Sequence, residues 1–186
     1  DAGSVYLFRR NSDSTDDVTQ IAKFQADDAA SGTYFGNSVA MVGDYVVVGA
    51  EQANSSGSAY LFKRNSDTTD DVTQLAKIQP SDGEATDYFG SSVAVSGNYI
   101  IVGAYAEDTN GSMAGSAYLF KRNSDATDDV TQLAKIQPND VEAGDYFGYS
   151  VAISGDYVVV GAYLEDTSGS NAGSVYLFKR NSDTTD

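Results

Sequence analysis

The stretch YFGSSVAVSGNYIIVGAYAED, Tyr88 to Asp108, decides the fold. A Phe89-Gly90 step is followed by a short polar turn, a run of β-branched residues and Gly103-Ala104. The run Tyr99–Val102 is almost continuously apolar, which is typical of a strand that is buried on both faces. The turn before it has the length and composition of a β-hairpin turn. The stretch therefore predicts two antiparallel strands joined by a tight hairpin.

The same pattern recurs along the whole chain. A strand of the form GS[AV]YLF begins at Gly3, Gly57, Gly115 and Gly173, so the last three copies are 58 residues apart. The first interval is four residues shorter, and the missing residues lie in the loop before Gly57. A repeat period above about 50 residues indicates propeller blades or another repeat array. The chain is therefore read as a repeat protein.

Each repeat divides into four short strands, and no segment shows helical periodicity. In the middle repeat the predicted strands are Phe89–Val95, Asn98–Ala104, Ser116–Arg122 and Val130–Gln137. This predicts an all-β fold of four-stranded antiparallel sheets, arranged as a β-propeller or as an open repeat array. The predicted division is a partial repeat at 1–34, repeats at 35–88 and 89–146, and a partial repeat at 147–186.

The aromatic and glycine positions have a structural interpretation. Where neighbouring sheets converge, glycine and alanine allow the backbones to approach closely, and the phenylalanine fills the gap between sheets. The positions concerned are Phe35, Gly36, Gly49, Ala50, Phe89, Gly90, Gly103, Ala104, Phe147, Gly148, Gly161 and Ala162.

Composition excludes several functions. The net charge of the 186 residues is −16, which repels nucleic acid and anionic membranes, and no stretch is apolar enough to span a bilayer. The chain has no cysteine and no histidine, so thiolate and imidazole chemistry are not available. Acidic pairs such as Asp70-Asp71 recur in every repeat, whereas an active site is rarely copied in this way. The protein is predicted not to be an enzyme.

The repeated FG and GA pairs resemble the FG-GAP repeat family, the blades of the integrin-α-type β-propeller. The resemblance rests on Phe35-Gly36 with Gly49-Ala50 and on its two later copies, each followed by the GS[AV]YLF strand. It implies an extracellular or cell-surface adhesion or scaffolding protein. In integrin-type blades the loop between the first two strands carries a D-x-D-x-D-G calcium motif. Here that loop is as short as Ser96-Gly97-Asn98, as in short-loop microbial members, so those ligands are not carried over.

Calcium is the candidate cofactor at a different loop, between the third and fourth strands. Oxygen-bearing side chains alternate there in the pattern N-x-D-x-T-x-D, and Ca²⁺ takes six to eight oxygen ligands. The candidates are Asn65, Asp67, Thr69 and Asp71, with Asn11, Asp13, Asp17, Asn123, Asp125 and Asp129 in the other copies. Asp70 stands where a calcium loop prefers glycine. A solvated, aggregation-resistant edge and Asx turns explain the same residues.

Other candidate sites lie in the loop between the second and third strands. Glu107-Asp108 with Asn110, echoed by Glu165-Asp166, forms a second acidic group. Asn54 and Asn110 begin N-glycosylation sequons. Tyrosines such as Tyr105 have two interpretations, packing between repeats and stacking on sugars. The basic residues lie at the end of the third strand and in the middle of the fourth, and they are interpreted as cross-strand partners of the acidic loops.

The phase of the repeats leads to the functional expectation. Strands of the third and fourth type come first, and the last repeat stops after its third strand, which leaves partial sheets with open edges. We expect self-association into a filament, an appendage or a ring through completion of partial sheets between chains. The alternative is an adhesion module from a larger propeller, stabilised by calcium and recognising a glycan or a surface protein.

Overall fold

The computed structural model describes residues 2–11, 17–66 and 71–181, and this part of the chain is built from antiparallel strands without a helix. The predicted all-β fold is therefore confirmed. The strands are β1 (Val5–Arg10), β2 (Val18–Phe24), β3 (Val39–Val42), β4 (Tyr45–Ala50), β5 (Ser58–Arg64), β6 (Val72–Ile78), β7 (Ser92–Ser96), β8 (Tyr99–Ala104), β9 (Ser116–Arg122), β10 (Val130–Ile136), β11 (Phe147–Ser154), β12 (Tyr157–Ala162) and β13 (Ser174–Lys179).

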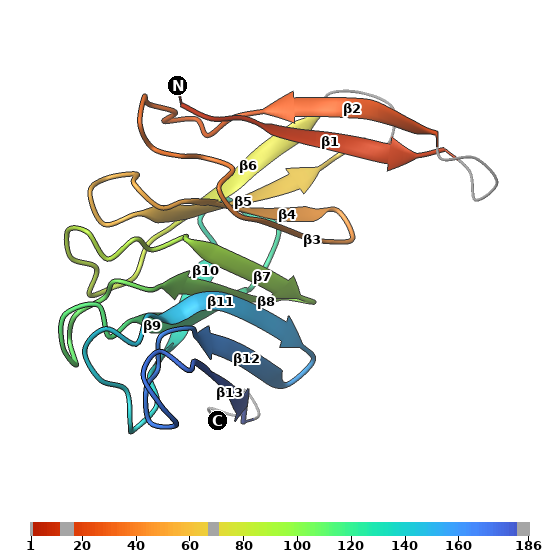
Figure 1. Ribbon diagram of the computed structural model, residues 1–186. Helices are drawn as coiled ribbons and strands as arrows, with labels where there is room; N and C mark the ends of the chain where they lie inside the picture. The colour runs from red at the N-terminus through yellow and green to blue at the C-terminus, as the bar shows by residue number, and fades with distance from the viewer. Residues whose placement is uncertain (1, 12–16, 67–70, 182–186) are drawn as a thin grey trace.

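The strands form four sheets that are stacked in chain order (Figure 1). Sheet 1 is the pair β1-β2, sheet 2 has the order β3-β4-β5-β6, sheet 3 β7-β8-β9-β10, and sheet 4 β11-β12-β13. Sheets 2 and 3 thus have four strands each, whereas sheet 1 lacks the first two strand positions and sheet 4 lacks the last. The described stack stays open at both ends.

The register between the third and fourth strands is the same in sheets 2 and 3. Tyr60 pairs with Lys77 in sheet 2, and Tyr118 pairs with Lys135 in sheet 3. A register shift separates the two halves of each pairing between the third and fourth strands, and it recurs in sheets 1, 2 and 3. Repetition of the sequence therefore reproduces even the local irregularities of the sheet.

The first strand of each repeat is shorter than predicted in two of the three copies. Strand β7 begins at Ser92, and Phe89 instead forms an isolated parallel bridge with Gly57 of sheet 2. Gly90 has a φ of 91°, and its counterpart Gly148 has a φ of 90°. In the last repeat, by contrast, β11 begins at Phe147 itself.

The core consists of three apolar clusters, one in each interface between consecutive sheets. The second strand of sheet 2 contributes to both of its faces, because Val46 and Val48 point toward sheet 1 and Val47 points toward sheet 3. All three valines are buried, as predicted for a strand covered on both faces. The strands β3, β7 and β11 lie next to one another, so the sheets converge along their first strands.

Candidate functional site

The FG and GA residues lie where consecutive sheets meet. Phe89 is fully buried, and its ring stands edge-on to Tyr118 at a centroid distance of 5.5 Å. A Cβ atom on Gly103 would overlap the carbonyl oxygen of Gly148 in the next repeat, and one on Gly90 would overlap that of Ser58. These glycines therefore stand where side chains would push successive sheets apart.

A row of tyrosines crosses the loops of sheets 3 and 4. Tyr88 stacks on Tyr105 with ring centroids 5.2 Å apart and planes 7° from parallel. Tyr105 contacts Tyr146 and Tyr149, and both of these contact Tyr163. The rings thus pack between consecutive repeats, while Tyr149 and Tyr163 still expose about half of their surface. The row combines packing with an accessible aromatic surface.

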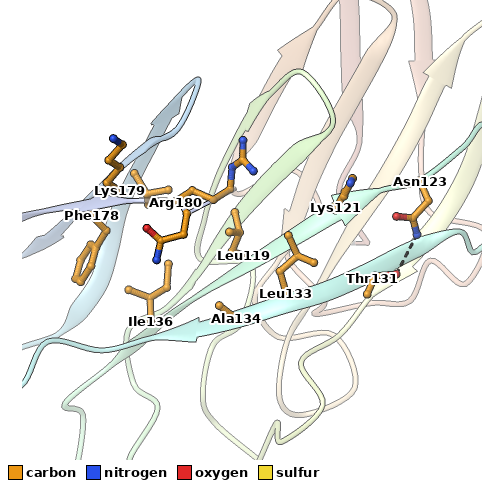
Figure 2. Close-up of a pocket in the computed structure, with 12 residues that line it drawn as sticks. Leu119, Lys121, Asn123, Thr131, Leu133, Ala134, Ile136, Phe178, Lys179 and Arg180 are labelled. Atoms are coloured by element: carbon orange, nitrogen blue, oxygen red, sulfur yellow. Dashed lines mark hydrogen bonds between the residues drawn. The ribbon is translucent and has the colours of Figure 1, made fainter. Parts of the chain in front are cut away.

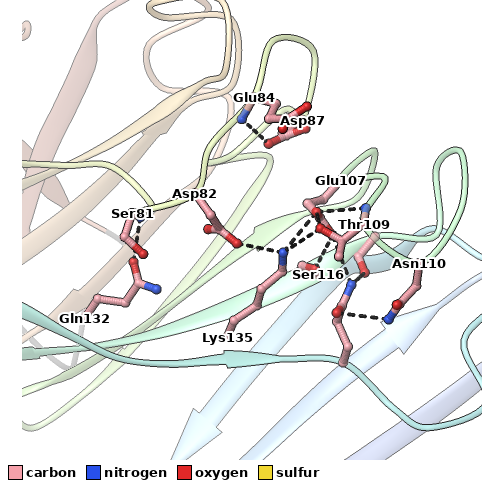
Figure 3. A network of polar contacts seen from close by, with 12 residues as sticks. Ser81, Asp82, Glu84, Asp87, Glu107, Thr109, Asn110, Ser116, Gln132 and Lys135 are labelled. Atoms are coloured by element: carbon pink, nitrogen blue, oxygen red, sulfur yellow. Dashed lines mark hydrogen bonds and ion pairs between the residues drawn. The ribbon is translucent and has the colours of Figure 1, made fainter.

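A lysine on the fourth strand joins each complete sheet to the linker before it, and Figure 3 shows this contact for sheet 3. The Nζ atom of Lys135 lies 2.8 Å from Asp82 and 3.0 Å from Glu107. Lys77 forms the matching ion pair with Asp28 in sheet 2. Asp82 and Asp28 belong to the linkers that precede their sheets, so these two contacts fix one repeat onto the next, whereas Glu107 lies in the loop between β8 and β9 of the same sheet.

Buried Glu107 is the centre of the network in sheet 3. Its carboxylate accepts hydrogen bonds from Ser116 Oγ at 2.7 Å, from the Thr109 N–H at 3.0 Å and from Gln137 Nε2 at 3.0 Å, besides the ion pair with Lys135. Burial tends to raise the pKa of Glu107, but the bonds from Ser116, Thr109 and Lys135 outweigh it and lower that pKa. Burial likewise acts against the charge of Lys135, and its carboxylate partners raise its pKa nonetheless. The network is built to hold charges.

Sequence reasoning missed this network. The basic residues were expected to pair across the hairpin of the third and fourth strands. Most of the described ion pairs instead leave this hairpin. Lys135 reaches the linker before its sheet, and Arg64 pairs with Asp44 in the turn between β3 and β4 of the same sheet. Lys63 pairs with Asp125 of the next repeat. Arg122 with Asp125 is the described pair that stays within the hairpin. The recurring Lys and Asp positions were visible, but nothing in the sequence said that each Asp faces the following repeat.

The calcium candidates lie on exposed loops, and the structure describes only part of them. Asp13, Asp67 and Thr69 lie outside the described residues. Asn123 Nδ2 donates to Asp129 at 3.0 Å and to Thr131 at 2.9 Å, which closes the base of its loop. Asn65 makes the same bonds to Asp71 and Thr73, and Asn11 bonds Thr19. Asp17 is exposed. No group of three carboxylates that could hold a metal occurs in the described part of the chain, so calcium stays a prediction.

The remaining candidates in the loops are placed as follows. Asn54 and Asn110 are both exposed, and Asn110 Nδ2 donates to Gln137. Asp108 and Asp166 are exposed, whereas their neighbours in sequence Glu107 and Glu165 are buried. The two members of each acidic pair therefore face different surroundings, and glycosylation of the two asparagines stays a prediction.

The end sheets expose what the middle sheets bury. Leu61 and Ala59 of β5 are 1% and 0% exposed, whereas Leu177 and Val175, at the same positions of β13, are 67% and 73% exposed. On β1 of sheet 1, Tyr6 and Phe8 are exposed while their counterparts on β5 and β9 are buried. The two ends of the stack therefore expose apolar side chains whose counterparts in the middle sheets are buried.

The stack of sheets defines a repeat module of the β-propeller type. The family model described as FG-GAP repeat matches residues 18–62, 72–120 and 130–178. These matches cover more than half of the chain, which therefore belongs to the FG-GAP repeat family. No curated protein matches the sequence.

Family membership gives a general functional class. FG-GAP repeats are structural or binding repeats rather than typical enzymes, and they occur typically in extracellular or surface proteins. The described part of the chain has no helix that is long and apolar enough to cross a membrane.

Proposed function

We propose that this protein is an extracellular structural module that self-associates, with the partial sheets of one copy completed and covered by those of another. The observation that carries the proposal is the exposure of the two end faces, which consist of residues that the interior of the same molecule buries. Exposed apolar patches of this kind mark interaction surfaces.

The interface between sheets 2 and 3 indicates what covers these faces. There, Leu61 on one sheet packs in the same cluster as Tyr118 and Phe120 on the other. Leu177 on sheet 4 is the counterpart of Leu61, and Phe8 on sheet 1 is the counterpart of Phe120. A further repeat sheet therefore fits both faces, and a second copy of the chain supplies one. Because the two faces differ, the contact is head to tail, and it gives a ring if it closes and a filament if it does not.

The solution mass of the 186-residue chain, measured by light scattering across a dilution series, tests this function. We expect species well above 19.6 kDa that dissociate on dilution. Leu177→Asp should shift the protein to monomer, because it places a charge in the contact. Met113→Asp is the matched control, since Met113 is 43% exposed in the loop between β8 and β9, away from both end faces. A well-folded monomer at all concentrations would refute self-association.

A second candidate function is ligand binding, and the tyrosine row supports it. Tyr149 and Tyr163 lie 4.4 Å apart between ring centroids and are half exposed, which suits stacking against a sugar ring. The chain contains no tryptophan, so tyrosine fluorescence reports binding directly. Quenching by a glycan that is lost in Tyr163→Ala would support this function, and no response to a panel of glycans at millimolar concentration would argue against it.

A further inference from the structure

A groove runs along sheet 4 where a fourth strand would lie (Figure 2). It has a volume of about 510 Å³ and lies between β9-β10 of sheet 3 and β12-β13 of sheet 4. Its apolar lining includes Leu133, Ile136 and Phe178. At the equivalent place between sheets 2 and 3, where β10 is the fourth strand, the depression is only about 190 Å³.

The floor of the groove is apolar surface that other sheets cover. Leu133 occupies the bulge position of β10 and is 43% exposed, whereas Leu75 at the same position of β6 is 5% exposed. Leu75 and Ile78 of β6 belong to the core cluster formed with sheet 3. Ile136, the counterpart of Ile78, is only partly buried. A further sheet whose fourth strand fills the groove would bury Leu133 and Ile136 in the same way.

The acidic half of the lysine network recurs beside β13, outside the residues that line the groove. Asp140 and Glu165 hold the positions that Asp82 and Glu107 hold in sheet 3. Glu165 is buried, and it accepts hydrogen bonds from the Thr167 N–H at 2.8 Å and from Ser174. Burial, together with these two carboxylates, raises the pKa of Tyr176 to about 12. In sheet 3 the fourth strand brings Lys135 to this place, but the described part of sheet 4 has no fourth strand.

Strand β2 and the residue after it carry the side chains that match these acidic groups. Gln20, Lys23 and Gln25 occupy the positions of Gln132, Lys135 and Gln137. In sheet 3, Gln132 accepts from the Ser81 N–H of the preceding linker at 2.9 Å, and Gln137 donates to Glu107 at 3.0 Å. At sheet 4, Asn139 is the counterpart of Ser81 and offers a backbone N–H, and Glu165 is the counterpart of Glu107 and offers a carboxylate.

Among the fourth strands, β2 belongs to the smallest sheet. Its sheet has two strands, and two-stranded sheets are marginally stable by themselves. Its partner β1 reads VYLF at Val5–Phe8, and β13 reads VYLF at Val175–Phe178. Because the partner sequences are the same, β2 finds on β13 of another copy the pairing surface that it has on β1.

We propose that β13 of one copy accepts β2 of a second copy in exchange for β1, so that the head-to-tail contact is a swapped strand. The register is that of β9 with β10, and it places Lys23 of the second copy opposite Tyr176 and between Asp140 and Glu165. This inference rests on the proposed self-association and names the segment that performs it. The replacement costs little, because β13 carries the same VYLF sequence as β1 and β2 regains on β13 the pairing that it loses on β1.

The swapped contact also accounts for exposed residues outside the groove. Once β2 joins sheet 4, β1 of the second copy leaves the stack together with Tyr6 and Phe8, and sheet 2 of the second copy stacks on a complete sheet. Val39 and Met41 on β3 are 57% and 46% exposed because sheet 1 has no strands above them, whereas Val93 on β7 is 9% exposed. Strands β11 and β12 of the first copy would cover them, and β3-β6 of the second copy would cover Val175 and Leu177.

Engineered disulfides test the exchange, because the chain has no cysteine of its own. Arg10 pairs with Val18, next to the Asn11 N–H that bonds the Asp17 carbonyl, so their side chains belong to a close, non-hydrogen-bonded pair. Arg10→Cys/Val18→Cys, when oxidised, locks β1 onto β2. We expect the locked chain to be monomeric and a reductant to restore its assembly. The control is Arg64→Cys/Val72→Cys, the same pair in sheet 2, which should assemble whether oxidised or reduced.

A second variant traps the exchanged state. Val18→Cys/Arg180→Cys should form disulfides between chains, seen as a ladder of covalent oligomers on a non-reducing gel, since Arg180 holds in the last repeat the place of Arg10. Assembly that persists in the oxidised Arg10/Val18 variant, with no ladder from the Val18/Arg180 variant, would overturn strand exchange and leave self-association standing.

A peptide of residues 17–25 separates the two proposals. The locked, oxidised chain should bind it in the groove, and a peptide with Lys23→Glu should bind at least about tenfold more weakly because it meets Asp140 and Glu165 with a like charge. Binding of the peptide to a chain that never assembles would refute the proposed function but keep the groove as an acceptor of β2. Equal binding of both peptides, or of neither, would refute the lysine contact.

Discussion

Sheets 2 and 3 and sheet 4 share almost one sequence, yet they differ in which faces they bury. Leu61 and Leu177 occupy the same position of the same strand motif, and their exposed fractions are 1% and 67%. In this fold, burial is therefore a property of stacking rather than of the strand. The middle of the molecule shows the repeat covered on both faces, and the ends show the same repeat with one face exposed.

The largest expected effect on stability comes from shortening the buried leucine in the middle of the stack. Leu61→Ala should lower the free energy of unfolding by about 3 kcal/mol, through lost apolar burial and a cavity between sheets 2 and 3. Leu177→Ala should change it by less than about 0.5 kcal/mol in a dilute monomer, because the side chain is already in water. Urea denaturation followed by circular dichroism measures both. Equal losses would mean that the face of sheet 4 is covered even in dilute solution.

The next effect concerns the close approach of successive repeats. A Cβ atom on Gly103 would overlap the carbonyl of Gly148, but one on Gly161, the matching glycine of sheet 4, would meet only the side chain of Ser150. Since a hydroxyl can rotate away and a backbone carbonyl cannot, Gly103→Ala should cost about 2 kcal/mol and Gly161→Ala clearly less. Thermal unfolding of the two variants compares them, and a larger loss for Gly161→Ala would contradict the assignment.

The lysine network gives a smaller, pH-dependent effect. Lys135→Met removes the cation beside buried Glu107 and should cost about 1–2 kcal/mol at pH 7, discounted because Lys135 is partly exposed. The pKa of Glu107 is lowered from 4.5, so the stability that its ionised form contributes is present above about pH 4.5 and is lost as the pH falls through the lowered pKa. The cost of the substitution should therefore shrink in acid. A cost that is independent of pH would mean that Lys135 acts through packing alone.

Much of the fold could be predicted from the sequence, because the same strand and turn motifs recur in several copies. The FG and GA pairs, the apolar run of β8 and the hairpin turns predicted the strands and their antiparallel pairing, which are local properties. Strand starts were less accurate, since Phe89 belongs to a bridge between sheets rather than to β7. That bridge joins residues far apart in the sequence, and periodicity within one strand does not report such contacts.

The candidate site was harder to predict, because its partners come from different repeats. Lys135 and Asp82 lie in neighbouring repeat units. The loops predicted to bind calcium, by contrast, are exposed and acidic stretches that stand out in the sequence. Buried polar groups such as Glu107 and Asp87 look like surface acids in a chain with a charge of −16. Only the packing of the linkers against the sheets distinguishes them.

Asp87 provides the smallest of the expected effects, and one opposite in sign to the others. It is 3% exposed, and burial, together with nearby Glu107 and Asp108, raises its pKa from 3.8 to about 6 although it accepts the Glu84 N–H at 2.7 Å. The folded protein thus holds this proton more tightly than the unfolded chain, and stability falls as the pH rises from about 4 to about 6.

Asp87→Asn should consequently stabilise the protein at pH 7, by about 1 kcal/mol after discounting for solvent screening, and the gain should vanish near pH 4. Exposed Asp166→Asn, which removes the same charge at sheet 4, controls for the change in net charge. Unfolding curves at a series of pH values measure both variants. The first linker already carries the uncharged Thr33 at the position of Asp87, so the repeat itself accepts a neutral residue there. A gain in Asp166→Asn as large as that in Asp87→Asn would trace the effect to the overall charge of −16 rather than to burial at the joint between sheets 2 and 3.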